Sequence, residues 1–380
     1  MAEVPVSPDV LKWAREYRGL DEAAASEKLG ISLADLQAYE AGTRKPTVSI
    51  FERFASRYKL PQATLFRSTR PNVPDALVDF RTVGGGKSKE SFEYKIVLSE
   101  VRGFLSELKR ISLEDEEFST PKLPEYSPAD DPAELGMKER ARLGVGINAQ
   151  ISWLGGEGFK RWRAVIEKQG VSVFLKKYPY TDSRGFSLFE DPATPGIVIN
   201  KNEETDAARS FSLIHEYAHL LIRRPGISDH NPRNPVEAFC NRFAAAFLMP
   251  DAALRKLLPY WPNQPIDWSF GEVAAWAKKL KVSQGALALR LEQAKLAPEG
   301  FYARFNRPNT TVRTPRDAVQ VNPITVRIFE LGGNYQGAVL GAMDRGAISE
   351  ITAVQALGLT EQYFDKVRAN LTRQRALAGE

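Results

Sequence analysis

The most constraining feature of the sequence is a pair of histidines four residues apart, His215 and His219, inside the mostly apolar, helix-compatible run 209–222. At about 100° per residue, positions i and i+4 lie on one face of a helix, so both imidazoles can reach a single ion at about 2.0–2.1 Å. Glu216 falls on the neighbouring flank, where a carboxylate can act as a general base without binding the ion. The spacing therefore meets the chemical requirements of a catalytic metal site.

The surroundings of this stretch also favour a metal helix. Thr205 or Asp206 can cap its start, and apolar residues can bury its other faces. All three histidines of the chain fall between His215 and His230, a clustering that scattered structural histidines would not show. The alternative is an ordinary amphipathic helix whose two histidines are core or surface residues.

Composition limits the class of protein. With 380 residues, 43% hydrophobic and 26% charged, the chain can build two or three domains of about 150 residues each. The single cysteine, Cys240, excludes an intramolecular disulfide framework and fits a reducing compartment. We see neither a signal peptide nor an apolar run of about 20 residues, so we expect a cytoplasmic protein without membrane spans. The net charge of +5 permits contact with nucleic acid but does not demand it.

Residues 8–66 read as five short helices. The second and third, 21–29 and 32–40, are joined by a turn with Gly30 and have the layout of a helix-turn-helix. The sequence L-G-I-S at 29–32, followed by L-Q-A-Y-E-A-G-T-R-K-P-T, resembles the XRE (Cro/repressor-like) helix-turn-helix family. The resemblance implies a fold that commonly binds DNA.

The charges of this segment argue against strong DNA contact. Residues 1–68 hold ten Lys/Arg and nine Asp/Glu, a net charge of +1. Asp21, Glu22 and Asp35 stand where the helices would face phosphates, and carboxylates repel phosphates at close range. The candidates for DNA contact are Arg15, Arg18, Ser32, Gln37, Arg44 and Lys45. DNA and a protein partner are therefore equal alternatives for this domain.

Residues 70–136 read as a connector. The run G-G-G-K-S at 84–88 suggests a phosphate-binding loop, but that motif needs a glycine where Arg81 stands. We therefore interpret the run as a flexible turn. Apolar residues at helical spacing predict an amphipathic helix over 91–110, and an acidic, proline-rich linker with a domain boundary follows it.

Residues 137–306 are expected to form the core around the metal helix. One helix over 137–168 and three short strands, at 171–175, 185–189 and 196–200, precede it. The edge strand of such a sheet can hold an extended peptide by main-chain hydrogen bonds.

A catalytic zinc takes three protein ligands and keeps a fourth position open, so a third ligand is needed beside the histidines. Pro225 stands where the metzincin motif has its third histidine, which excludes that subclass. The downstream candidates are Asp229, His230 and Glu237. Glu237 could equally belong to a capping box that starts at Asn234. Spacing alone leaves these two roles of Glu237 open.

Two motifs resemble those of the ImmA/IrrE family of metallopeptidases: R-x-F-S-L-x-H-E-x-x-H-L-L at 209–221 and E-x-x-C-N-x-F-A-x-x-x-L-M-P at 237–250. The resemblance extends over residues 140–305. It implies a zinc ion on His215, His219 and Glu237, with Glu216 as the base.

Three further residues near these motifs can be interpreted. We read Cys240 as a packing residue, because this position is commonly small in the family. Asn241 lies one turn after Glu237 and can orient a ligand. His230, in a loop rich in Asn and Pro, could stabilise the transition state or simply be exposed.

These patterns predict a mainly α protein with a small β-sheet (α+β). We expect a five-helix helix-turn-helix domain at 1–69, a connector at 70–136, a zincin-like metallopeptidase core at 137–306 and a helical domain at 307–380. The last segment carries no chemical motif, and dimerisation or partner docking through its helices is the expectation.

The expected function is a zinc-dependent, gluzincin-like endopeptidase. By the family resemblance, its substrate is a helix-turn-helix repressor or an antitoxin-like regulator, cleaved in response to phage, DNA damage or another stress. The alternative is a DNA-binding transcriptional regulator whose zinc domain is a sensor or a structural module. The expected partners are thus a protein substrate, DNA as a second candidate and a second copy of the chain, without a membrane.

Overall fold

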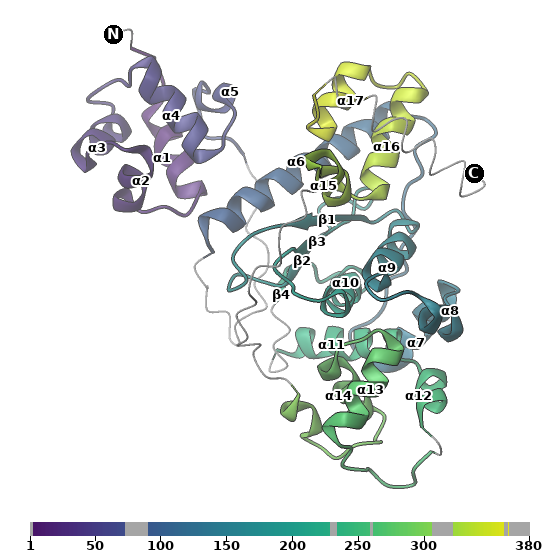
Figure 1. Cartoon of the computed structure of the whole chain (residues 1–380). Coiled ribbons are helices and arrows are strands. Elements are labelled where there is room, and N and C mark those ends of the chain that lie inside the picture. Colours follow the sequence, from purple (N-terminus) through teal and green to yellow (C-terminus); the bar gives the residue numbers. More distant parts are fainter. Residues whose placement is uncertain are drawn as a thin grey trace. The chain divides into compact units, whose positions relative to one another are not determined.

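The computed structural model describes residues 3–72, 90–228, 234–258, 261–305, 322–360 and Phe364, without the side chains of Pro323 and Ile324 (Figure 1). Two compact units divide the chain: Met1–Leu77 with Lys87–Val101, and Val78–Gly86 with Arg102–Glu380. The long helix α6 (Phe92–Glu114) contributes to both. None of the helices described is both long and apolar enough to cross a bilayer.

Five helices build the N-terminal unit before α6, as predicted: α1 (Pro8–Tyr17), α2 (Glu22–Leu29), α3 (Leu33–Ala41), α4 (Val48–Tyr58) and α5 (Gln62–Leu65). The side chains of Asp21 and Ser32 cap α2 and α3 by accepting hydrogen bonds from backbone N–H groups of the first turn. Gly30 and Gly42 end these helices at φ values of 64° and 75°, which glycine adopts without strain. Local signals therefore determine the helix-turn-helix.

A small mixed sheet organises the second unit. Its strands are β1 (Ser172–Lys176), β2 (Gly185–Leu188), β3 (Gly196–Asn200) and β4 (Ile227–Ser228). Their order is β1-β3-β2-β4, with β1 parallel to β3 and the other neighbouring pairs antiparallel. The first three strands are those predicted. Strand β4 was not predicted, because a two-residue strand has no alternating pattern to detect.

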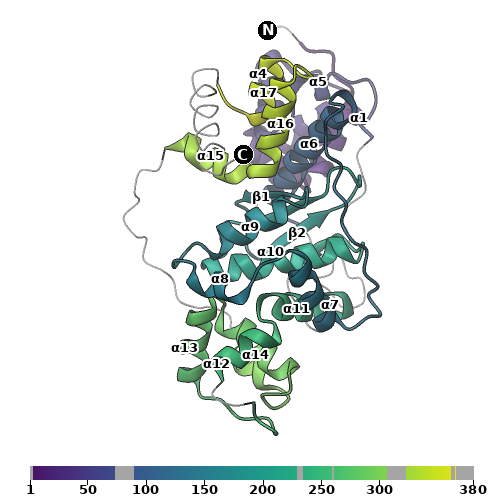
Figure 2. The same cartoon turned by 90° about the vertical axis from the view of Figure 1, so that its right-hand side faces the viewer.

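Helices cover both faces of this sheet (Figures 1 and 2). On one face, α9 (Gly158–Glu167) and α10 (Asp206–Leu221) pack against alternate residues such as Val173 and Ile197. On the other face, Phe174 contacts Phe104 of α6 and Tyr335 of α16 (Gly333–Asp344). The remaining helices of the unit are α7 (Pro132–Arg142), α8 (Ile147–Ser152), α11 (Pro235–Leu248), α12 (Asp251–Leu257), α13 (Phe270–Leu280), α14 (Gln284–Gln293), η1 (Phe301–Arg304), α15 (Pro323–Leu331) and α17 (Glu350–Leu357).

The prediction of one helix over 137–168 is wrong. Three helices, α7, α8 and α9, occupy this region. Gly144 and Gly156 stand in the two breaks at φ values of 71° and 84°, a conformation that a continuous right-handed helix cannot contain. The apolar periodicity extends across both breaks and conceals them.

The acidic, proline-rich stretch after α6 packs on the second unit. Asp115 is 5% exposed and accepts a hydrogen bond from Arg345 Nε at 3.0 Å. The backbone N–H of Tyr126 donates to the carbonyl of Leu221, at the end of α10, at 2.9 Å. The acidic, proline-rich composition of the stretch predicted a linker. Its packing could not be predicted from the sequence, because the residues that it contacts are distant along the chain.

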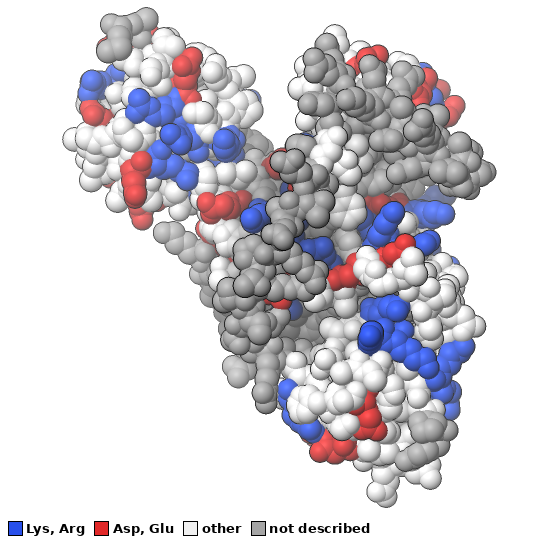
Figure 3. All heavy atoms as spheres, in the orientation of Figure 1, with Lys and Arg blue, Asp and Glu red and all other residues white. Residues whose placement is uncertain are grey.

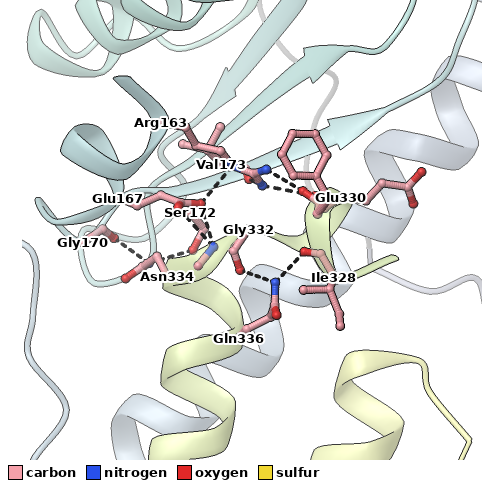
Figure 4. Close-up of polar contacts among 12 residues, drawn as sticks. Arg163, Glu167, Gly170, Ser172, Val173, Ile328, Glu330, Gly332, Asn334 and Gln336 are labelled. Carbon is pink, nitrogen blue, oxygen red and sulfur yellow. Dashed lines mark hydrogen bonds and ion pairs between the residues drawn. The ribbon is translucent and has the colours of Figure 1, made fainter. Parts of the chain in front are cut away.

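The C-terminal helices attach to α9 and β1 through a buried ion pair (Figure 4). Nε of Arg163 lies 3.1 Å from Oε1 of Glu167, and the two side chains are only 5% and 10% exposed. Arg163 donates to the carbonyl of Phe329 near the end of α15, and Glu167 accepts from the N–H of Gly333 at 3.0 Å, where α16 begins. Both charges complement the helix dipoles. Gly332 connects the two helices at a φ of 80°, so a glycine is required at this turn.

Candidate metal centre

Helix α10 carries the two histidines between the sheet and α11 (Figures 1 and 2). The side chain of Thr205 caps the helix by accepting from the N–H of Ala208 at 3.0 Å. Every residue from Ser212 to Leu221 is buried. Because the helix is enclosed on all sides, packing determines where its side chains point.

Four candidate ligand atoms from three residues lie close together beside α10. Nε2 of His215 lies 3.1 Å from Nε2 of His219, and the two oxygens of Glu237, on α11, lie 3.2 Å from these nitrogens. A tetrahedral ion with bonds of about 2.0–2.1 Å separates its ligand atoms by roughly 3.3–3.4 Å. The spacing of these donor atoms is therefore close to the spacing that zinc requires.

Hydrogen bonds on the far side of each ring fix the histidines. Nδ1 of His219 lies 2.8 Å from the carbonyl oxygen of Arg224, which can only accept, so this nitrogen carries the proton. Nδ1 of His215 lies 3.0 Å from Oδ1 of Asn241, the residue predicted to orient a ligand. Both contacts leave the Nε2 lone pairs directed at the common point, as in metal sites with such outer partners.

The electrostatics of this cluster favour a positive charge. Burial would raise the pKa of Glu237, but the two imidazoles outweigh it and lower the pKa to about 2. Burial lowers the pKa of His215. Burial opposes a charge on His219 as well, yet Cys240 and Glu237 raise the pKa of this histidine well above its usual range. A cation bound between the three donors would displace the proton that His219 otherwise holds.

The sequence matches two known domain families. Residues 166–292 match the IrrE N-terminal-like domain of peptidase family M78, and residues 9–66 match a helix-turn-helix domain. The chain has the ImmA/IrrE architecture with an N-terminal helix-turn-helix domain. No curated protein matches the chain. The match to the IrrE N-terminal-like domain contains both histidines and Glu237, and it supports a metallopeptidase-type enzyme.

The carboxylate of Glu216 lies against strand β2 in this ImmA/IrrE domain. A Cβ atom added to Gly185 would lie 3.1 Å from Cγ and 3.2 Å from Oε1 of Glu216, and 2.9 Å from the carbonyl oxygen of Val198. Gly185 also pairs with Ser228 of β4. The sequence analysis did not identify Gly185, whose only signal is a glycine within a strand.

Cys240 offers an alternative third ligand. Its fully buried thiol and the donor atoms of His215 and His219 all lie within 4.8 Å of one another. Thiolate sulfur binds zinc at about 2.3 Å, so the set of two histidines and this cysteine is chemically reasonable. Cys240 is therefore a possible metal ligand as well as the packing residue that the sequence predicted. Glu237 remains a candidate beside it, because each of its two oxygens lies 3.2 Å from one histidine nitrogen.

A polar network holds α10 from behind. Tyr217, between Glu216 and His219 in the sequence, donates its hydroxyl to the fully buried Glu139 of α7 at 2.7 Å. Burial would raise the pKa of Glu139, but hydrogen bonds from Arg142, Tyr217 and Tyr126 outweigh it and lower the pKa. An ionised carboxylate thus ties α7 to the metal helix.

Two of the predicted DNA contacts are unavailable. Arg15 is 7% exposed and donates to both oxygens of Glu40 at 2.8 Å. Arg18 is 1% exposed and donates to the carbonyl of Tyr58 at 2.7 Å. Both predictions need correction, because guanidinium groups that hold the core of the N-terminal unit cannot reach phosphates.

The other predicted DNA contacts lie at the surface. Ser32 caps α3, and Gln37 donates to Glu22 at 2.7 Å. Arg44 forms an ion pair with Asp35, and Lys45 is exposed. The predicted residues Asp229 and His230 lie outside the described residues.

Proposed function

We propose that the chain is a zinc-dependent endopeptidase, with His215, His219 and Glu237 as ligands and Glu216 as the base. The observation that carries this proposal is the cluster of two Nε2 atoms, 3.1 Å apart, with an oxygen of Glu237 3.2 Å from each of them. A purely structural site would need no carboxylate such as Glu216 beside it. The match to a metallopeptidase-type family supports the same reaction class.

The side chains divide the chemistry among themselves. Bound zinc would supply the Lewis acidity that polarises the scissile carbonyl and acidifies the attacking water. Glu216, positioned against Gly185, takes the proton from that water and later gives it to the leaving amine nitrogen. Asn241 and the carbonyl of Arg224 keep the histidines in one tautomer throughout.

We propose that the substrate binds as an extended strand along β4. Within the described sheet, β1 and β4 are the outer strands, and α15 and α16 contact β1. Strand β4 pairs Ser228 with Gly185, the residue in contact with Glu216. A peptide added at β4 by main-chain hydrogen bonds would therefore pass the side of the sheet nearest to the base.

The ImmA/IrrE resemblance suggests the kind of substrate. We propose a helix-turn-helix repressor or an antitoxin-like regulator, cleaved in the cytoplasm during a phage, DNA-damage or other stress response. The test incubates the zinc-loaded protein with the repressor encoded beside it, against Glu216→Gln. The variant keeps all proposed ligands and should bind zinc normally, while cleavage falls by about 10²–10⁴-fold. Equal cleavage by both proteins would refute the assignment of Glu216.

A second candidate is a DNA-binding regulator whose zinc domain serves as a sensor. The matched helix-turn-helix domain favours it. In that case Glu216→Gln would leave regulation by the chain intact, whereas the peptidase proposal requires the regulatory response to disappear together with cleavage.

A further inference from the structure

Several cations of the N-terminal unit gather around two depressions that no described residue of α3 lines, although α3 is the helix that a helix-turn-helix usually presents to DNA. A depression of about 630 Å³ lies between α2 and α4, and one of about 390 Å³ adjoins it. Four cations line them: Lys28, Arg53, Arg57 and Lys59. Glu27 is the one carboxylate among the described residues that line either depression. Figure 3 shows this concentration of Lys and Arg side chains on the unit.

Most of these cations are available to a ligand. Arg57 and Lys59 are exposed, and no ion pair joins them or Lys28 to a carboxylate within the part of the chain that the structure describes. The ammonium group of Lys28 lies 3.9 Å from the ring centroid of Phe92, so an aromatic face forms part of the same surface. By contrast, Arg44 beside α3 is already neutralised by Asp35.

Hydrogen bonds hold Arg53 in place at the floor of this surface. Its Nη1 atom donates to the carbonyl oxygens of Leu29 and Gly30 at 3.1 Å each. These carbonyls lie at the end of α2, where a cation complements the helix dipole. Arg53 thus connects α4 to the end of α2 that carries Lys28.

The two ends of α2 carry charges of opposite sign. Asp21 and Glu22 stand at its first turn and Lys28 at its last. The net charge of +1 over residues 1–68 therefore hides an uneven distribution of charge along this helix. A polyanion approaching the unit is attracted to the end with Lys28 and repelled from the end with Asp21.

We propose that this cationic surface binds the phosphodiester backbone of nucleic acid, without reading the bases. The match to a helix-turn-helix domain favours nucleic acid over an acidic protein segment. The planar fork of Arg57 suits phosphate oxygens, and Lys28, Lys59 and Arg57 can together neutralise about three phosphates. Backbone contact of this kind predicts similar affinity for unrelated sequences and steep dependence on salt, with a slope of about −2.7 in log K against log salt concentration.

The experiment measures fluorescence anisotropy of the full chain with two labelled duplexes of unrelated sequence, about 20 base pairs long, between about 50 and 200 mM salt. We expect Arg57→Gln/Lys59→Gln to weaken binding to both duplexes by about tenfold and to reduce the slope by about 1.8. The comparison variant Arg44→Gln/Lys45→Gln, beside α3, should change affinity less than about twofold. Circular dichroism confirms folding, and Lys28→Gln provides an independent variant if the double variant unfolds.

Three results would overturn the proposal. The first is that the Arg44 and Lys45 variant loses binding while the Arg57 and Lys59 variant binds as the wild type does. DNA would then contact the side of α3 instead. The second is no binding of either duplex at the lowest salt concentration. The third is binding of poly-glutamate, but not of DNA, that depends on Arg57 and Lys59, which would identify an acidic protein as the partner.

Discussion

Replacing Gly185 by alanine tests whether strand β2 positions the proposed base. The new Cβ would lie 2.9 Å from the carbonyl oxygen of Val198, closer than real Cβ contacts, and 3.1 Å from Cγ of Glu216. The contact with the backbone oxygen can be relieved only by a shift of β2 relative to β3, and the contact with Cγ requires the side chain of Glu216 to move as well. Overpacking of this kind costs about 1–3 kcal/mol of unfolding free energy. A displacement of about 1 Å at the reacting group lowers the rate about 10²-fold.

The assay separates positioning from metal loss. Cleavage, bound zinc and chemical denaturation are measured for Gly185→Ala and for the control Gly103→Ala. Gly103 lies in α6 with no atom within 4 Å of an added Cβ, so its substitution should stabilise the helix by about 0.5–1 kcal/mol. Zinc content should stay normal in both variants, because neither glycine supplies a ligand. Wild-type cleavage and stability in Gly185→Ala would refute the reasoning.

Three further predictions concern the ligands and their support. Glu237→Gln should abolish zinc binding while Cys240→Ala retains it; the reverse pattern in metal analysis would make the thiol the third ligand. Asn241→Ala should weaken zinc affinity about 10–100-fold in a chelator competition, because the ring of His215 loses its orientation. Glu139→Gln should cost about 1–3 kcal/mol of unfolding free energy near neutral pH. Because the folded pKa of Glu139 is lowered, its contribution is present above the unfolded value of about 4 and is lost as pH falls through the folded pKa, so denaturation curves of variant and wild type should converge in acid.

Local features allowed much of the fold to be predicted. The N-terminal helices follow from an N-cap at one end and a glycine at the other, such as Ser32 and Gly42 around α3. The metal helix follows from Thr205 and from the apolar pattern after it. The short strand β4 and the breaks around α8 escaped prediction, since neither changes the periodicity of the surrounding residues. The predicted boundaries at residues 69, 136 and 306 stay predictions.

The sequence by itself determined the relation between His215 and His219, because four residues of helix fix their common face. It could not decide between a ligand and a cap for Glu237, since only the packing of α11 on α10 brings that carboxylate within 3.2 Å of both rings. The same packing brings Cys240 near both histidines, and the packing of β2 on α10 places Gly185 against Glu216. Likewise the sequence supplies a sum of charges, whereas the fold buries Arg15 and Arg18 and gathers other cations on one face. Interactions within a helical turn can be derived from spacing, whereas contacts between distant segments depend on how whole helices and strands pack.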